Sequence, residues 1–533
     1  MSINLAGLLD RSSNHTTARV VEIDITGKRR ELTHSELTEL ARTRARQLTA
    51  AGVRPGHLIG IRAANSLDWL AWDLAALATG ARLKAFADTT EIPDPDDFVA
   101  RHRLALLIAD VPATTPAVFR PDGAPGPDAV PPTATVVETD DVHSLVYSSG
   151  TSGRLKGLEI SVKGTEYVIN RFMSDFGVTG RDRHLIFLPL ANYQQRLSVY
   201  LCLWLGADLV LASYQRVFQA VRKESPTFLI GPPVFYDTTL QLYMKSGGAA
   251  SLADFLGGRI RFLITGMAPI RRQTLDAFRE RDVTLLEVYG LTETGMVAWN
   301  TPDENRPGTV GRLIDPDAVT FLDDGEVLIN RPAPLGRGYF DTDGDPSAAE
   351  IFQPDGTILT GDYGRLDPDG FLTLLGRKKD VIALGSGRKV HPAEIEAAFT
   401  GIDGVSEIIV VPTPQSNRLG AIVTATDPAD TVLRDHIRKR IEETNATLDA
   451  HERVMSLVFS DTPLRSDPVF MTANMKLSRG LAAARFAEAV GTESASGEIA
   501  AGARASGARA SDARASGAPA PDTVAPTDSG SGR

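Results

Sequence analysis

The residues best suited to chemistry form a run of hydroxyl and glycine residues that leads to a lysine. The run consists of Ser148, Ser149, Gly150, Thr151, Ser152, Gly153 and Lys156. Glycine and serine lose much conformational entropy in a helix and add little to a core, so the run predicts an exposed loop. Backbone N–H groups and hydroxyls around a lysine are suited to bind a phosphate. The spacing differs from the common nucleotide P-loop, and an ordinary glycine–serine turn between two strands is the alternative interpretation.

Three later stretches carry polar residues that could act with this loop. They lie within residues 288–295, 359–382 and 471–479. Their candidate site residues are Tyr289, Gly290, Thr292, Glu293, Asp362, Arg377 and Lys476. The first stretch follows a buried strand directly, where open α/β sheets bind ligands. Each residue alone has an ordinary structural interpretation, such as a helix start, a turn cap or a solvated charge. Their occurrence in one chain is what indicates a function.

Helix-like and strand-like segments alternate around these stretches. Residues 34–53 predict a helix, and residues 58–63 predict the strand that follows it. The alternation returns at residues 68–81, 225–233, 260–269, 271–282 and 283–290. Buried strands with helices between them predict an α/β fold on largely parallel sheets.

The chain is expected to divide into three parts. At 533 residues it is too long for one core. From residue 315 short strands with Asp-Gly turns predict a small β subdomain, and after Lys379 a new α+β unit begins. We predict an N-terminal domain over residues 1–378, a small C-terminal domain over 379–490 and a disordered tail over 491–533. The tail repeats Ala-Arg-Ala-Ser and holds almost no large apolar side chain.

The composition excludes several classes of protein. A net charge of −11 argues against a nucleic-acid binder. The single cysteine, Cys202, excludes a disulfide within the chain and lies in an apolar run, which predicts burial. No stretch has the length of a membrane helix and no secretory signal is recognisable, so we expect a cytoplasmic protein without an integral membrane segment. The sequence has no His-x-x-x-His pair, which argues against a structural zinc site. It also has no Gly-x-Ser-x-Gly elbow, which argues against the usual hydrolase.

Together the four polar stretches resemble the adenylate-forming superfamily, which includes acyl-CoA synthetases, peptide-synthetase adenylation domains and luciferases. The motifs occur in the family's order, and the resemblance covers about residues 10 to 485. It implies a large ATP- and substrate-binding domain followed by a mobile small domain. It also implies that ATP and Mg²⁺ activate a carboxylic acid as an acyl-adenylate, with CoA as the expected second substrate.

The resemblance assigns a part of the nucleotide to each motif. The loop from Ser148 to Gly153, with Lys156, would close over the β- and γ-phosphates. Thr292 would contact the α-phosphate, and Glu293 would hold Mg²⁺. The residues implied to lie at the adenine and ribose are Gly266, Met267, Ala268, Pro269, Tyr289, Gly290, Asp362 and Arg377.

Two lysines are implied to serve the reaction cycle. Lys476 would bridge the substrate carboxylate and the α-phosphate during adenylation, and Lys379 would be the hinge about which the small domain turns. The chemistry agrees with such a lysine. A carboxylate that attacks the α-phosphate brings like charges together, so positive groups must neutralise the charge where it develops.

Residues 188–196, LPLANYQQR, resemble the long-chain acyl-CoA synthetase branch, but Asn192 stands where that branch has histidine. The predicted substrate pocket contains Asn192, Tyr193, Arg196, Gly231 and Pro232. Arg196 has bracing of the helix as its alternative role. Polar groups after Asn192 suit an aliphatic tunnel poorly, so we predict a small or polar acid rather than a long fatty acid.

Three functions stay open at this point, besides some other adenylating reaction. The first is an acid–CoA ligase. The second transfers the activated group to an amine, or adenylates nitrite to form a diazo group, in specialised metabolism. The third, from another class, is a non-catalytic adenylate-binding regulator, which the presence of both Glu293 and Lys476 opposes.

Overall fold

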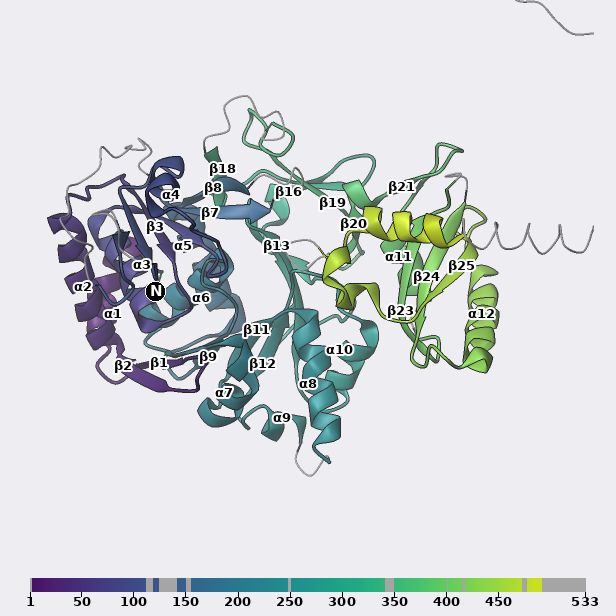
Figure 1. The fold of residues 1–533 in the computed structure, drawn as a ribbon, viewed down its shortest axis with the longest axis horizontal. Helices are drawn as coiled ribbons and strands as arrows, with labels where there is room; N and C mark the ends of the chain where they lie inside the picture. The colour runs from purple at the N-terminus through teal and green to yellow at the C-terminus, as the bar shows by residue number, and fades with distance from the viewer. Residues whose placement is uncertain are drawn as a thin grey trace, which may run out of the picture.

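The computed structural model describes residues 2–111, 118–123, 141–149, 155–247, 251–340, 349–399, 401–414, 418–471 and 477–490 (Figure 1). Of residues 147–149, 155, 156 and 468 it describes the backbone alone. The tail predicted over residues 491–533 lies outside the described part of the chain.

A nine-stranded sheet forms the centre of the larger part of the molecule. In spatial order its strands are β15 (Arg312–Leu313), β14 (Gly295–Trp299), β13 (Leu285–Leu291), β12 (Phe262–Thr265), β11 (Phe228–Gly231), β9 (Arg183–Ile186), β10 (Asp208–Ala212), β1 (Arg19–Ile23) and β2 (Arg29–Thr33). The strands from β13 to β1 in this order pair parallel. The outer strands β14, β15 and β2 pair antiparallel.

A seven-stranded sheet lies beside it. Its strands in spatial order are β18 (Gly336–Phe340), β8 (Leu155–Ser161), β7 (Val142–Ser149), β4 (Arg82–Phe86), β3 (Leu58–Arg62), β5 (Leu106–Ala109) and β6 (Val118–Phe119). The pairs from β7 to β6 are parallel, whereas β8 pairs antiparallel with both of its neighbours.

Helices cover the strands and join the two sheets. The helices of the larger part are α1 (Leu8–Ser13), α2 (His34–Ala50), α3 (Leu67–Thr79), α4 (Pro95–Arg101), α5 (Val162–Phe176), α6 (Tyr193–Leu205), α7 (Val217–Glu224), α8 (Pro233–Lys245), α9 (Leu252–Phe255) and α10 (Arg272–Arg279). One continuous core contains side chains of α3, α5, α6 and of both sheets. A second core lies on the other face of the nine-stranded sheet, under α7, α8, α9 and α10. The α/β fold with parallel sheets is confirmed.

Helix α6 is the most deeply buried of these elements. It ends at Gly206, whose φ of 71° is the left-handed conformation that favours glycine at a helix end. Cys202, on this helix, is fully buried, as its apolar surroundings predicted. Tyr193 and Arg196 of its first turn bond to His143 and Ser144 of β7, and the helix also contacts β9 and β10 of the nine-stranded sheet.

A four-stranded antiparallel sheet follows along the chain. It contains β16 (Val319–Phe321), β17 (Glu326–Ile329), β19 (Ile358–Leu366) and β20 (Leu372–Arg377). This sheet corresponds to the predicted small β subdomain. A 3₁₀ turn over Lys378–Asp380 follows β20.

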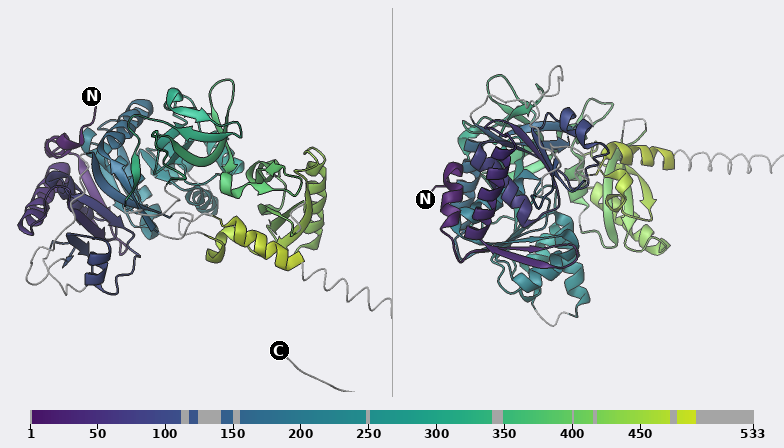
Figure 2. Two further views of the ribbon diagram at one scale, coloured as in Figure 1. Left: turned by 90° about the horizontal axis from the view of Figure 1, so that it is seen from above. Right: turned by 60° about the vertical axis from the view of Figure 1, so that its left-hand side comes forward.

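The last unit is small and of α+β type. It contains β21 (Ile382–Ala383), β22 (Lys389–Val390), α11 (Pro392–Ala398), β23 (Val405–Pro412), β24 (Leu419–Ala425), α12 (Thr431–Asn445) and β25 (Val454–Ser460). Residues 479–490 form the helix that ends the described chain. The unit has hydrophobic clusters of its own and lies at one end of the molecule (Figures 1 and 2). The limits of the three predicted domains stay predictions. Among the described residues, no helix is both long and apolar enough to cross a membrane.

Candidate active site

The turn between β13 and β14 carries Thr292 and Glu293. Both side chains are half-buried, while Thr294 beside them is fully buried and donates from its hydroxyl to the Gly295 carbonyl at 2.9 Å. A Cβ on Gly290 would lie 2.6 Å from the Gly295 carbonyl oxygen, so the hairpin needs glycine there. This close approach fixes the path of the two strands and therefore the position of Thr292 and Glu293 between them.

Side chains from two distant elements hold this turn. Gln194 of α6 donates from Nε2 to the Thr292 hydroxyl oxygen at 3.0 Å. Tyr339 of β18 donates from its hydroxyl to Glu293 Oε1 at 2.9 Å. The Gly336 N–H also donates to the Glu293 carbonyl at 2.9 Å. The turn is thus connected to α6 and to the edge strand of the seven-stranded sheet.

Tyr289, Asp362 and Arg377 form one polar group, joined by a hydrogen bond and an ion pair. The Tyr289 hydroxyl donates to Asp362 Oδ2 at 2.8 Å, and Arg377 Nε lies 3.2 Å from Asp362 Oδ1. Residues 362 and 377 are directly paired partners of β19 and β20. Burial, together with the charge of Asp362, raises the pKa of Tyr289 well above its usual value, so the phenol stays protonated and remains a donor. The resemblance assigns all three residues to the nucleoside, and the structure brings them together.

The loop after β12 approaches this group from the neighbouring strand. A Cβ on Gly266 would lie 3.1 Å from Val288 Cγ2, so the loop packs closely on β13 just before Tyr289. Met267 has a φ of 70°, an uncommon conformation for a residue with a side chain, and is half exposed. Gly266 thus lies next to the strand that carries Tyr289. The place of residues 266–269 at the nucleotide stays a prediction.

The predicted phosphate loop is described only at its ends. Strands β7 and β8 pair antiparallel up to Ser149 and Leu155. The backbones of Ser148 and Lys156 are partners in this ladder. Four further predicted residues of the loop, Gly150, Thr151, Ser152 and Gly153, lie outside the described residues, and so does Lys476.

Two residues of the predicted substrate pocket lie in a buried polar network. The Arg196 guanidinium pairs with both oxygens of Asp73 and also donates to Ser144 Oγ at 2.5 Å and to the Tyr200 hydroxyl at 2.9 Å. The Tyr193 hydroxyl lies 2.7 Å from His143 Nε2 and 2.6 Å from Thr165 Oγ1. Arg196 is fully buried and Tyr193 is 1% exposed.

These contacts favour the alternative role of Arg196, bracing of the helix. Burial lowers the pKa of His143 well below its usual value, so the imidazole is neutral beside the guanidinium. Since the polar atoms of Tyr193 and Arg196 are engaged with protein groups, we assign both residues to the support of α6.

The remaining predicted pocket residues lie at strand and helix ends. Asn192 is the exposed N-cap residue of α6, and its side chain makes no capping hydrogen bond. Gly231 ends β11, and a Cβ there would lie 3.2 Å from the rings of Phe187 and Phe235. Pro232 precedes α8. Their contact with a substrate stays a prediction.

The predicted hinge lies just after β20. Lys379 is exposed, in the 3₁₀ turn that leads to the C-terminal unit. Its neighbour Lys378 pairs with the buried Glu326 of β17 at 2.5 Å. This ion pair anchors the residue before the predicted hinge to the small sheet.

The residues around Glu293 suit a magnesium ion. Mg²⁺ usually takes one or two protein carboxylates and completes its shell with water and substrate phosphates. Glu293 fits this pattern, because Tyr339 occupies Oε1 and leaves Oε2 without a protein partner among the described residues. The described residues contain no cluster of three or more His, Cys, Asp or Glu side chains that could hold a metal on their own.

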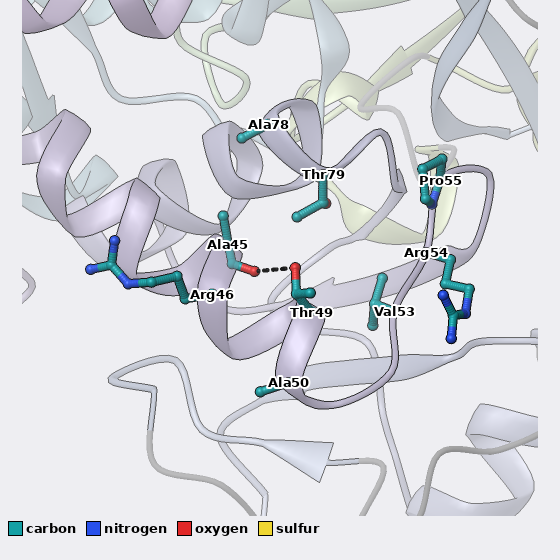
Figure 3. Close-up of a pocket in the computed structure, with 9 residues that line it drawn as sticks. All are labelled: Ala45, Arg46, Thr49, Ala50, Val53, Arg54, Pro55, Ala78 and Thr79. Atoms are coloured by element: carbon teal, nitrogen blue, oxygen red, sulfur yellow. Dashed lines mark hydrogen bonds between the residues drawn. The ribbon is translucent and has the colours of Figure 1, made fainter.

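A surface cavity elsewhere does not belong to this site. It has a volume of about 600 Å³ and lies at the C-terminal ends of α2 and α3 (Figure 3). Its lining residues are Ala45, Arg46, Thr49, Ala50, Val53, Arg54, Pro55, Ala78 and Thr79. The Thr49 hydroxyl is engaged with the Ala45 carbonyl at 3.0 Å, and none of the predicted site residues lines the cavity.

Sequence reasoning missed two residues of the site. The local pattern marks Gln194 only as a polar residue after Asn192, and it carries no sign of a role for Tyr339. The Gln194–Thr292 contact spans 98 residues of sequence and the Tyr339–Glu293 contact spans 46. Apart from the unusual glutamine in an apolar stretch, nothing in the local pattern could have indicated them.

The α/β architecture, with a large part followed by a small α+β unit, matches the adenylate-forming fold. Residues 9–340 match the family described as AMP-binding enzyme, and residues 379–493 match the AMP-binding enzyme C-terminal domain. The chain therefore belongs to the AMP-binding enzyme family, and the predicted superfamily is confirmed. It is an adenylate-forming enzyme that binds ATP.

Two relatives illustrate this membership. A 3-[(3aS,4S,7aS)-7a-methyl-1,5-dioxo-octahydro-1H-inden-4-yl]propanoyl:CoA ligase from Mycobacterium tuberculosis is 30% identical, over 74% of this chain and 83% of the relative. The long-chain-fatty-acid–CoA ligase FadD15 from Mycobacterium bovis is 25% identical, over 86% of this chain and 92% of the relative.

Solved structures share the fold at lower identity. The anthranilate CoA ligase AuaEII, in complex with anthranoyl-AMP, has a TM-score of 0.74 at 20% identity, over 91% of this chain and 97% of that one. The amide bond synthetase McbA from Marinactinospora thermotolerans has a TM-score of 0.71 at 22% identity, over 91% of this chain and all of that one.

Proposed function

We propose that this chain is an ATP-dependent acid–CoA ligase that forms an acyl-adenylate and then transfers the acyl group to the thiol of CoA. The observation that carries the proposal is the polar group of Tyr289, Asp362 and Arg377, joined by a hydrogen bond and an ion pair, beside the turn with Thr292 and Glu293. The two relatives named as CoA ligases, each similar over most of this chain, support the choice of acceptor.

In the first step a carboxylate oxygen of the acid attacks the α-phosphorus of ATP, and the bond to the bridging oxygen of pyrophosphate breaks. Asp362 would accept from the ribose hydroxyls, and Arg377 and Tyr289 hold its carboxylate in place. Thr292 would donate to an oxygen of the α-phosphate. Lys476 would bridge that phosphate and the acid. A lost donor of this kind typically lowers the rate by about 10² to 10³.

Mg²⁺, when bound, neutralises phosphate charge that the protein's own groups leave uncompensated. Glu293 is the residue that would hold it. In the second step the CoA thiol loses its proton to solvent, its sulfur attacks the acyl carbonyl carbon, and AMP leaves with the electron pair of the broken anhydride bond. The exposed Lys379 would be the hinge that lets the small C-terminal domain turn between the two steps.

The polar start of α6 supports a second candidate function. Gln194 and Asn192 offer carboxamides where an aliphatic tunnel would prefer apolar side chains. An amine acceptor with a small acid, or nitrite in place of the acid as in a diazotase of specialised metabolism, would use the same adenylation chemistry.

Pyrophosphate release tests both candidates. The purified chain would be given ATP and Mg²⁺ with a panel of aryl acids, fatty acids and nitrite, each with and without CoA and an arylamine. Product formation that needs both a carboxylic acid and CoA is the expected result. Turnover that needs an amine or nitrite, and is indifferent to CoA, would move the function to the second candidate.

Two lysine variants provide the matched control. Lys476→Ala should lower pyrophosphate release by about 10² or more. Lys439→Ala, at an exposed position of α12, should leave it unchanged. Binding of ATP without turnover on any substrate of the panel would instead support a non-catalytic regulator.

A further inference from the structure

Helix α6 is held in one rotational position by its buried side. Tyr193 and Arg196 are three residues apart and therefore lie on one face of the helix, where both are bonded inside the core. Gln194 follows Tyr193 by about 100° of rotation. The buried network consequently fixes the direction in which the Gln194 side chain leaves the helix, towards the turn after β13.

The hydrogen bond between Gln194 and Thr292 orients both groups. The Thr292 oxygen accepts from Gln194 Nε2 at 3.0 Å, so its own proton is available to donate elsewhere. Among the described residues no acceptor for that proton is present at Thr292. A threonine hydroxyl prepared in this way can donate to an anionic oxygen of the adenylate.

The same bond directs the carbonyl oxygen of Gln194 away from Thr292. This oxygen has no protein partner among the described residues, and the side chain is only half-buried. A ligand that contacts it must either supply a hydrogen-bond donor or remove water from an unpaired acceptor. An acid that covers this half-buried acceptor without supplying a donor leaves it buried and unpaired, which lowers binding by about 10- to 100-fold.

We infer that Gln194 is a specificity-determining residue, and that the enzyme selects a short acid with a hydroxyl or amino group able to donate to the Gln194 carbonyl. The inference rests on the proposed adenylation of an acid and names the substrate class of that same site. A long unbranched alkyl acid leaves the carboxamide unpaired and is disfavoured. A site built to pair a polar group rejects an analogue that lacks it far more strongly than an apolar pocket rejects an added group.

The test compares matched acids on matched variants. Pyrophosphate release would be measured with benzoate, its hydroxy and amino derivatives, and straight-chain acids of increasing length. The proteins are the wild type, Gln194→Met, which keeps the length of the side chain without its amide, and Gln273→Met, at an exposed position of α10. The ratio of kcat/KM between a donor-bearing acid and its unsubstituted parent is the readout.

The wild type and Gln273→Met should prefer donor-bearing acids by about 10-fold or more in kcat/KM. Gln194→Met should reduce that ratio to near one and raise kcat/KM for the alkyl acids. Merely structural damage would lower kcat/KM for all acids alike and leave the ratio unchanged. An unchanged ratio in an active Gln194→Met overturns the inference and leaves the proposed function intact. A wild type that prefers long alkyl acids, or uses nitrite alone, also overturns it. Absence of pyrophosphate release from the wild type on every substrate removes the proposed function, and the inference with it.

Discussion

The hydroxyl of Tyr289 donates a hydrogen bond of 2.8 Å to the carboxylate of Asp362, 73 residues further along the chain. This bond joins β13 of the nine-stranded sheet to β19 of the small sheet. The second oxygen of Asp362 pairs with Arg377, so the carboxylate is held from both sides and is only 5% exposed. A buried carboxylate that is held from both sides has one fixed orientation, which is what recognition of two neighbouring hydroxyls requires.

We therefore expect Asp362→Ala to lower kcat/KM for ATP by about 100-fold, because hydrogen bonds to a charged group contribute about 1.5–3 kcal/mol each. Tyr289→Phe should lower it by about 10-fold, since the carboxylate remains but loses one of its holding groups. Steady-state kinetics with ATP as the varied substrate measure both. Tyr243→Phe on α8, whose hydroxyl has no hydrogen-bond partner among the described residues, is the control. Equal effects of Tyr289→Phe and Tyr243→Phe on kcat/KM for ATP would contradict the role given to Tyr289.

Tyr339 should set the requirement for magnesium. Its hydroxyl donates to Glu293 at 2.9 Å and fixes the orientation of the carboxylate that would hold the ion. Groups that orient a metal ligand typically change metal affinity by about 10-fold or more when they are lost. Tyr339→Phe should accordingly raise the Mg²⁺ concentration at half-maximal rate by about 10-fold, and high Mg²⁺ should restore the rate.

Calorimetric titration of Mg²⁺ into the ATP-bound enzyme gives a readout independent of turnover. Tyr214→Phe, at a residue 51% exposed, is the matched control and should behave as the wild type. A lower maximal rate in Tyr339→Phe with the same Mg²⁺ dependence would show that the contact is structural and does not serve the metal.

The buried pair of Arg196 and Asp73 should matter to stability more than to substrate binding. Removal of one partner leaves an uncompensated buried charge, which destabilises by about 3–5 kcal/mol. Arg196→Met or Asp73→Leu should each lower the temperature of thermal unfolding strongly. The double variant should lower it by much less than the sum, because no unpaired charge remains.

Scanning calorimetry measures these shifts, and an exposed pair provides the comparison. Arg42→Ala removes ion pairs with Glu39 and Asp10 at the surface, which should change stability by less than about 1 kcal/mol. Additive effects of Arg196→Met and Asp73→Leu, or a raised KM for the acid in a variant that unfolds at the wild-type temperature, would return Arg196 to the substrate pocket.

The fold could be predicted from the sequence at the level of its elements. Apolar strands alternating with helices indicated parallel sheets, and the apolar run around Cys202 indicated a buried helix, now α6. The order of the strands could not be predicted. Strand β10 precedes β11 in the chain, yet β9 lies between them in the sheet, and such crossovers depend on how helices pack rather than on local pattern.

Some contacts of the site could likewise be predicted from the sequence, and others could not. Tyr289, Asp362 and Arg377 could be placed near one another because the family resemblance implied their roles, and the structure joins them by a hydrogen bond and an ion pair. The partnership of Arg196 with Asp73, 123 residues away, could not be found, since a charged residue in a helix gives no local sign of its partner. The contact of Tyr339 with Glu293 could not be predicted either, because the two residues are distant in sequence.

Glu287, two residues before Tyr289 on β13, should make stability depend on pH. Burial raises the pKa of its carboxyl from near 4.5 to about 7, although the Gly308 N–H donates to it at 2.7 Å and Arg272 lies nearby. The folded protein thus holds a proton that the unfolded chain releases, so stability is fully present below about pH 4.5 and falls as the pH rises towards 7. A shift of this size corresponds to about 3 kcal/mol.

Glu287→Gln, which can still accept from Gly308, should match the wild type at pH 5 and unfold at a higher temperature at pH 8. Glu280→Gln, at an exposed carboxylate, should follow the wild type at both values. The four measurements use calorimetry, and a Glu287→Gln shift that is equal at pH 5 and pH 8 would refute a buried carboxyl that titrates near neutrality.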